Sequence, residues 1–159
     1  AEYGCTAKVH EIIKKYPDGK LDVSVIGYDK FKLLSYEENE KSYALGEIEI
    51  VCDTKEQIED SLLDDCIELF NFITNKIPVF RVQQTTKEDL TGRIASYYFA
   101  QKVGLIDKQK QHLLEMSSEN ERLAFLKKHL ERIKPSVSKA IEIEKIIRND
   151  GYLTPGDLK

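Results

Sequence analysis

Few side chains in this sequence are spaced as catalytic or metal-binding groups require. Ser138 and Lys139 could supply a hydroxyl and an amine, but neighbouring residues on a helix point about 100° apart, so the pair is not aligned as a dyad. The histidines are His10, His112 and His129, and none lies three or four residues from another histidine or a cysteine. We therefore expect hydrogen-bonded or solvated imidazoles rather than a zinc site.

Carboxylates gather in two places, at residues 37–40 and at Asp64-Asp65. Paired carboxylates can act as acid and base or hold a cation, but short charged runs usually lie on a solvated face. The eight glycines do not form the GxxxxGK[ST] loop that wraps nucleotide phosphates. The sequence thus predicts no catalytic residue, no metal site and no cofactor.

Aromatic side chains are better candidates for a functional surface. Tyr97, Tyr98 and Phe99 fall on adjacent faces of one helical turn, so they cannot all enter the same core. At least one should lie at the surface or between subdomains, where a tyrosine combines apolar contact with a hydrogen bond. The candidate peptide contacts, each with internal packing as its alternative, are Tyr28, Phe31, Tyr36, Tyr43, Tyr97, Tyr98 and Phe99.

Length and composition are those of a globular protein with a core of its own: 159 residues, 41% hydrophobic and 33% charged. No apolar stretch approaches the roughly 20 residues that cross a bilayer, so we expect a cytoplasmic protein without membrane contact. The three cysteines are widely spaced, and we expect small buried side chains rather than disulfides. The net charge is −4, and residues 1–53 carry 7 basic against 11 acidic side chains, which makes nucleic acid an unexpected partner.

The first third of the chain has the period of β-strands. Alternating apolar residues at 5–13 and 21–25 flank Pro17-Asp18-Gly19, which predicts a hairpin with a tight turn. We expect a second connection at residues 27–30, a third strand over 31–36, a loop over 37–42 and a fourth strand over 43–52. Such short links predict an antiparallel meander.

The period then changes to that of helices. Thr54 with Gln57 predicts a capped helix that ends near Asn75, and residues 79–82 could add a short β edge. Thr86 with Asp89 predicts a second helix reaching Val103, and a two-turn helix follows at Asp107. A long final helix begins after a capping box at Ser118 and Glu121, and Pro135 predicts a kink or break near Lys134.

Several stretches, in this order, resemble the amino-terminal domain of Lon proteases. In the β region they are Gly4-Cys5-Thr6-Ala7-Lys8-Val9, Asp18-Gly19 and residues 25–33; in the helical region they are Lys110-Gln111-His112-Leu113-Leu114-Glu115 and Arg122-Leu123. The resemblance implies an α+β fold, in which an antiparallel PUA-like β subdomain, a meander or partial barrel, precedes an α-helical bundle with a long carboxy-terminal helix. It also implies substrate binding without the ATPase or the Ser-Lys peptidase of Lon.

The expected organisation is a β subdomain over 1–53, a linking helix and extended segment over 54–82, a helical bundle over 83–150 and a tail over 151–159. In Lon proteases the β subdomain begins with strands that carry a Phe-Pro-Leu segment and a Phe-Pro-Gly turn, and this sequence contains neither. We therefore expect the strand at Cys5 to pair with absent strands or with a partner chain.

The resemblance favours a non-catalytic module that recognises unfolded or flexible protein segments. An RNA-binding PUA-like module is one alternative, supported by the basic residues of segment 127–134. A structural role is another, in which the long helix pairs with a second copy or with a partner domain absent from the sequence. A protease or an ATPase is the further partner that the resemblance implies.

Overall fold

The computed structural model describes residues 2–38, 43–76 and 84–146. They divide into two compact units. The sheet unit contains the residues up to Lys55 together with Ile106–Ser118, and the helical unit contains Glu56–Leu105 and the residues from Glu119 onward. The subdomain limits expected from the sequence remain a prediction. In the structure, residues 106–118 cluster with the strands.

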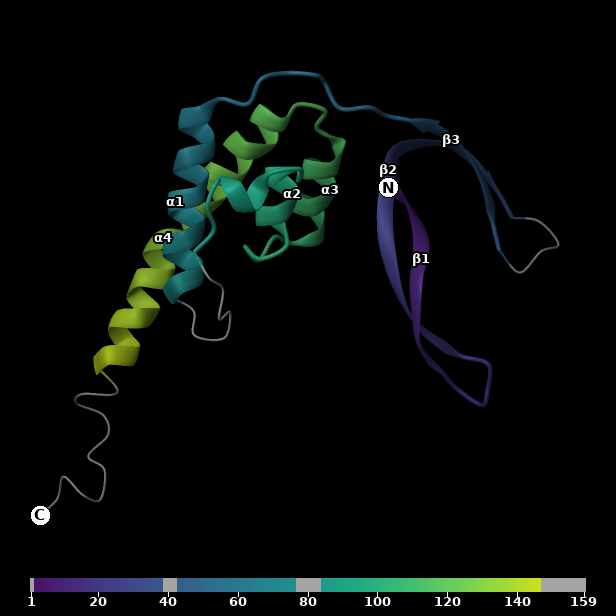
Figure 1. Cartoon of the computed structure of the whole chain (residues 1–159), viewed down its shortest axis with the longest axis horizontal. Coiled ribbons are helices and arrows are strands. Elements are labelled where there is room, and N and C mark those ends of the chain that lie inside the picture. Colours follow the sequence, from purple (N-terminus) through teal and green to yellow (C-terminus); the bar gives the residue numbers. More distant parts are fainter. Residues whose placement is uncertain (1, 39–42, 77–83, 147–159) are drawn as a thin grey trace, which may run out of the picture. The chain divides into compact units, whose positions relative to one another are not determined.

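Three antiparallel strands form the sheet unit, in the order β1, β2, β3. They are β1 (Tyr3–Lys15), β2 (Leu21–Glu37) and β3 (Leu45–Ile50), and the first two make a long curved ribbon (Figure 1). The turn between them has the expected chemistry, because Gly19 has a φ of 87° and the Lys20 amide donates to Asp18 Oδ1 at 3.2 Å. The expected antiparallel meander is confirmed, with three strands in place of four.

The expected connection at residues 27–30 is wrong, because β2 continues through it. Cys5 pairs with Lys30 and Ala7 with Gly27, so β2 contains one extra residue at this point, a β-bulge. Thr6 holds the bulge: its Oγ1 accepts from the Asp29 amide at 2.9 Å and donates to the Asp29 carbonyl at 3.4 Å. The glycine and polar residues that suggested a turn therefore bend one strand.

The helical unit is built on α1 (Asp60–Lys76) and α4 (Glu119–Ile146), which lie side by side (Figure 1). Between them in sequence come the 3-10 helix η2 (Glu88–Leu90) and the short α2 (Ala95–Ala100). Their apolar faces meet in one core, because each helix repeats apolar residues at three- and four-residue spacing. The buried apolar side chains are Cys66, Leu69, Phe70, Ile73, Leu90, Ala95, Phe99, Val103, Leu105, Leu123, Leu126 and Leu130.

The first two helices differ from their predicted bounds. α1 begins at Asp60, not at Thr54, because the Thr54 amide donates to the Ser117 carbonyl and the Glu59 amide to Asn120 Oδ1. The helix expected from Thr86 to Val103 is split between η2 and α2, with Gly92 at a φ of 74° between them, although Thr86 and Asp89 do bond as predicted.

α3 (Asp107–Glu115) and α4 confirm the last two predicted helices. α4 continues through Pro135, so the predicted break does not occur. A proline removes one backbone donor, but buried Leu126 and Leu130 anchor the turns before it, and Ser138 Oγ donates to the Lys134 carbonyl after it. The predicted β edge at residues 79–82 lies outside the described residues.

Burial separates the three cysteines, which the sequence predicted to be alike. Cys66 is buried and its Sγ donates to the Leu123 carbonyl at 3.4 Å, whereas Cys5 and Cys52 are exposed on the sheet unit. The expectation of burial was therefore wrong for two of them, because the sheet has too few covering elements to enclose them. Burial raises the pKa of the Cys66 thiol from 9.0 to about 12.

Thiol titration should show this difference. With excess of an aromatic disulfide reagent at pH 8, we expect rapid reaction at Cys5 and Cys52, and reaction of Cys66 only after unfolding, because the reactive thiolate forms least readily at the buried site. Cys66→Ala should leave the rapid phase unchanged. Three equally rapid thiols in the native protein would contradict the burial of Cys66.

Candidate functional site

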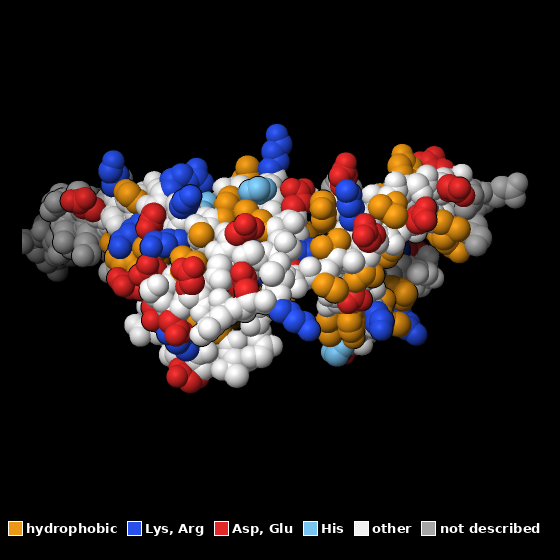
Figure 2. Space-filling view, turned by 90° about the horizontal axis from the view of Figure 1, so that it is seen from above, with side chains coloured by type: hydrophobic (Ala, Val, Ile, Leu, Met, Phe, Trp, Pro, Cys, Tyr) orange, Lys and Arg blue, Asp and Glu red, His pale blue; other side chains and the backbone are white. Residues whose placement is uncertain are grey.

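The sheet unit exposes far more apolar surface than the helical unit. Figure 2 shows hydrophobic side chains gathered over the sheet, with acidic and basic groups between them. The exposed large side chains on its strands include Val9, Ile13, Leu21, Val25, Tyr28, Leu34, Tyr36, Leu45, Ile48 and Ile50. Contiguous apolar surface of this kind marks an interaction site more often than chance exposure does.

The strand register collects part of this surface on one side. Phe31 pairs with Ile50, Leu33 with Ile48, and Tyr36 with Gly46, and directly paired residues point to the same face. We call these five large residues, Phe31, Leu33, Tyr36, Ile48 and Ile50, the apolar sheet face. Tyr36 is 64% exposed, Ile50 49% and Ile48 40%.

Two glycines shape the apolar sheet face. A Cβ on Gly4 would overlap the Phe31 ring, and one on Gly46 would lie 3.0 Å from Leu33 Cδ1. The side chains of Phe31 and Leu33 therefore rest on the backbone of the neighbouring strands. This close approach leaves those two residues only partly exposed.

The opposite face of β3 is acidic. Glu47 and Glu49 alternate with the two isoleucines, and their partners on β2 are Ser35 and Lys32. Ser35 Oγ donates to Glu47 Oε2 at 3.2 Å. Among the described residues β3 is an edge strand, so its outer backbone groups have no ladder partner there.

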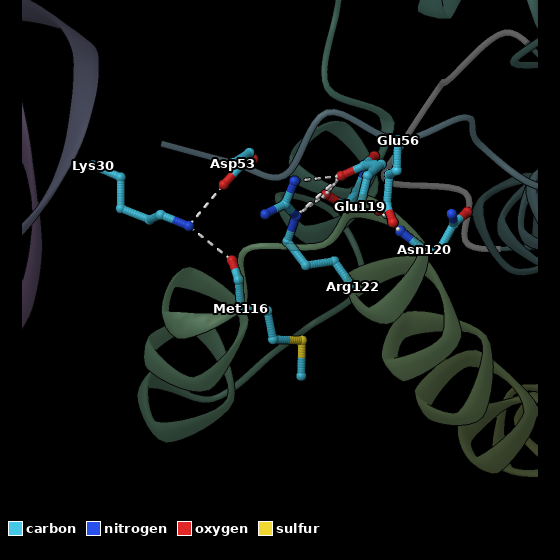
Figure 3. A network of polar contacts seen from close by, with 8 residues as sticks. Lys30, Asp53, Glu56, Met116, Glu119, Asn120 and Arg122 are labelled. Atoms are coloured by element: carbon cyan, nitrogen blue, oxygen red, sulfur yellow. Dashed lines mark hydrogen bonds and ion pairs between the residues drawn. The ribbon is translucent and has the colours of Figure 1, made fainter. Parts of the chain in front are cut away.

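Lys30 ties the sheet to α3. Its side chain is buried, and Nζ donates to Asp53 Oδ1 at 2.7 Å and to the Met116 carbonyl at 2.8 Å (Figure 3). Gln111 on α3 adds a bond from its Nε2 to the Tyr3 carbonyl at 3.2 Å. These contacts hold the part of β2 that carries Phe31, the first residue of the apolar sheet face.

The three consecutive aromatic residues of α2 have different surroundings. Phe99 is fully buried, with its ring centroid 5.0 Å from that of Phe70, so it cannot reach a peptide in the folded protein. Tyr98 is partly exposed, and its hydroxyl lies 3.1 Å from Thr85 Oγ1. Tyr97 is also partly exposed, with the Arg122 guanidinium 4.9 Å from its ring centroid.

A pocket of about 430 Å³ opens beside α2 in the helical unit. We call it the α2 pocket; it is lined by Arg93, Ile94, Tyr97, Tyr98, Gln101 and Lys102. Lys102 Nζ lies 5.3 Å and the Arg93 guanidinium carbon 5.8 Å from the Tyr98 ring centroid. The pocket therefore offers aromatic surface between two cations.

A buried ion pair fixes the elements around this pocket. Arg122 is 1% exposed, and its guanidinium donates to Glu119 Oε2 at 2.8 Å and to Ser96 Oγ at 3.0 Å. Glu119 also accepts from the Ser96 amide at 2.8 Å, so the first turns of α2 and α4 share one network (Figure 3). Asn120 extends it by accepting from the Glu59 amide at 2.9 Å, just before α1.

The structure separates the aromatic residues that the sequence proposed together. Phe31 and Tyr36 share the apolar sheet face, whereas Tyr97 and Tyr98 line the α2 pocket. Tyr28 is exposed at the bulge with Lys8 Nζ 4.6 Å from its ring centroid, and Tyr43 is exposed just before β3. Their role as peptide contacts remains a proposal.

Sequence reasoning missed the isoleucines of β3 as surface residues and missed the cations of the α2 pocket. The alternation of Ile48 and Ile50 with glutamates did predict a strand with two unlike faces, but not that the apolar face is open. Nothing in the local pattern joins Arg93 to Lys102. Their spacing of nine residues includes the turns on both sides of α2.

The described residues contain no group of three or more histidine, cysteine, aspartate or glutamate side chains that could hold a metal ion. None of the helices in the same residues is both long enough and apolar enough to span a membrane. The arrangement suits contact with another molecule through apolar, aromatic and charged surface.

The Arg122 network predicts a large effect on stability. Arg122→Leu should lower the free energy of unfolding by about 3–5 kcal/mol, because it leaves the buried Glu119 carboxylate without its cation. Lys110→Ala is the matched control: its ion pair with Asp107 is exposed, and the loss should be below about 1 kcal/mol. Chemical denaturation measures both, and a similar small loss in the two variants would show that the network is not stabilising.

Comparisons with known proteins support one family. The model of the ATP-dependent protease La (LON) substrate-binding domain matches residues 1–132. A crystal structure of a Lon N-terminal domain protein from Xanthomonas campestris has a TM-score of 0.55 and 16% identity, and the match covers 79% of this chain and 66% of that one. The N-terminal domain of a Mycobacterium avium complex Lon protease has a TM-score of 0.57 and 15% identity, covering 82% and 70% respectively.

At such identity the likeness shows the fold alone, and it confirms the expected α+β architecture with its long last helix. The chain spans about two thirds of the length of the Xanthomonas structure. Curated protein sequences gave no match. Because the family model covers most of the chain, the protein belongs to the substrate-binding domain family of ATP-dependent protease La (LON).

Proposed function

We propose that the chain recognises unfolded or flexible protein segments through the apolar sheet face and the outer edge of β3, which has no neighbouring strand among the described residues, without catalysing a reaction on them. One observation carries the proposal: the exposed side chains of Tyr36, Ile48 and Ile50 lie on one face, and the two isoleucines belong to β3, an edge strand among the described residues. Family membership supports the same role.

An extended segment can use both features at once. Its backbone would pair with the outer edge of β3, and every second side chain would lie on the apolar sheet face. Backbone pairing is independent of sequence, so binding should tolerate many segments. The side chains on the other face would lie beside Glu47 and Glu49, which favours segments that alternate apolar with basic residues.

Three of the five basic residues that favoured the RNA-binding alternative make contacts inside the helical unit. Lys127 Nζ pairs with Asp65 Oδ2 at 2.6 Å, and Lys134 Nζ lies 4.9 Å from the Phe72 ring centroid. His129 is buried, with Nε2 2.9 Å from the Val103 carbonyl oxygen. These three groups contact other residues of the helical unit, which leaves Lys128 and Arg132 as the exposed basic side chains of this segment.

Self-association is a second candidate, because an open sheet edge beside apolar side chains can also pair with a second copy. In the recognition role, a protease or ATPase partner would receive the bound segment, as the family description suggests.

The free cysteines fit a reducing compartment, which supports a cytoplasmic location.

A binding titration tests the proposal. The probe is a labelled peptide of alternating valine and lysine, and fluorescence anisotropy should show saturable binding below millimolar concentration. Ile48→Ser should weaken binding by about 10-fold, because burial of an isoleucine side chain contributes about 1.5–3 kcal/mol and 1.4 kcal/mol is tenfold. Val25→Ser is the matched control, since Val25 is exposed on β2 but lies outside the apolar sheet face.

Two further measurements separate the possible outcomes. The same peptide with alternate backbone nitrogens methylated should lose its binding, because it cannot donate to the edge of β3. Sedimentation at the same protein concentration shows whether a second copy already occupies the edge. Equal binding of the methylated peptide, or equal losses in Ile48→Ser and Val25→Ser, would count against recognition at this surface.

A further inference from the structure

We infer that the α2 pocket binds a side-chain carboxylate that neighbours an aromatic or apolar side chain in a protein segment. The inference rests on the proposed function for its class of ligand, a flexible protein segment, but it concerns a different surface with a different charge preference. The sheet favours apolar residues alternating with basic ones, whereas the α2 pocket carries two cations.

The two cations lack an internal counterion in the part of the chain that the structure describes. Arg93 and Lys102 both lie against the Tyr98 ring, and neither side chain forms an ion pair or hydrogen bond with a described carboxylate. Two lysines of the same unit do have carboxylate partners: Lys87 pairs with Asp64, and Lys127 pairs with Asp65. Two like charges near one ring repel each other, so a carboxylate placed between them gains from both.

The aromatic floor of the pocket is held in place before any ligand arrives. The Tyr98 ring packs against Phe70 and Phe99, with centroid distances of 5.8 Å and 5.9 Å, and its hydroxyl contacts Thr85. Tyr97 is supported by Arg122, which the Glu119 pair fixes. A surface that is already ordered loses little conformational entropy when a ligand binds.

The size and lining of the pocket fit a short piece of an extended chain. Its volume of about 430 Å³ accommodates one or two side chains. Ile94 is 47% exposed and, with Tyr97, provides apolar surface beside the cations. A nucleic acid usually needs a longer positive surface, which a chain of net charge −4 does not suggest, so a protein segment is the favoured ligand.

The test uses a labelled hexapeptide with Phe-Asp in Gly-Ser flanks, acetylated and amidated so that its only carboxylate is the aspartate. Anisotropy in 50 mM salt should show about fivefold tighter binding than that of the Phe-Asn peptide, because a partly exposed ion pair contributes up to about 1 kcal/mol. Arg93→Gln and Lys102→Gln should each weaken binding of the Phe-Asp peptide about threefold to fivefold. Lys128→Gln, an equal charge change at an exposed position of α4, should have no effect.

A charge reversal makes the test specific. The variant with both Arg93→Glu and Lys102→Glu should lose the Phe-Asp peptide and bind its Phe-Lys counterpart instead. The preference for Phe-Asp should shrink in 300 mM salt, because salt screens exposed charges. Circular dichroism verifies folding, and the Asp-to-Asn exchange in the peptide tests the same contact on the unchanged protein.

The outcomes distinguish this inference from the proposed function. If the alternating valine and lysine peptide binds but Phe-Asp and Phe-Asn bind equally, the α2 pocket assignment is overturned and sheet recognition stands. If neither peptide type binds, the proposed function fails as well. Tighter binding of a single-stranded oligonucleotide, lost in Arg93→Gln and Lys102→Gln, would overturn the protein-segment assignment in favour of nucleic acid.

Discussion

A charged side chain that leaves water must be paired, and the described part of the chain buries Lys30 in one unit and Arg122 in the other. In the sheet unit, Lys30 Nζ donates to Asp53 and to the carbonyl of Met116, which follows α3. In the helical unit, Arg122 gathers Glu119 and Ser96 at the starts of α4 and α2. Each pairing joins segments that are distant in sequence. Lys30 directly precedes Phe31 of the apolar sheet face, and Arg122 contacts the ring of Tyr97 in the α2 pocket.

The two units bury their apolar side chains to different extents. In the helical unit, α1, α2 and α4 enclose a continuous core around Phe70 and Phe99. In the sheet unit, three strands and one short helix leave most apolar side chains of the strands exposed, and Lys30 is the buried residue among the described strand positions. An open sheet with this composition is stabilised when another chain covers it, which is the physical basis of the proposed recognition role.

Backbone irregularity determines which residues face outward on the sheet. A shift of one residue transfers side chains to the opposite face, because successive residues of a strand alternate. The bulge at Asp29, held by Thr6, lets β2 pair with both neighbours while it curves. A second irregularity between Leu33 and Ser35 brings Tyr36 onto the same face as Leu33, although the two are three residues apart. The apolar sheet face therefore depends on the positions of these bulges.

Much of the architecture was determined by local sequence: the hairpin turn at Asp18-Gly19, the meander, the α3 and α4 helices and the family resemblance. These features depend on neighbours along the chain, whose turn preferences and apolar periods can be read directly. The tertiary structure alone decided that Gly27 bends a strand, that α1 starts at Asp60, and that Phe99 is buried while Tyr97 and Tyr98 line a pocket. It also brought Arg93 and Lys102 to one ring. Whether a side chain is buried or paired depends on segments that are distant in sequence, and the local residue pattern does not identify those segments.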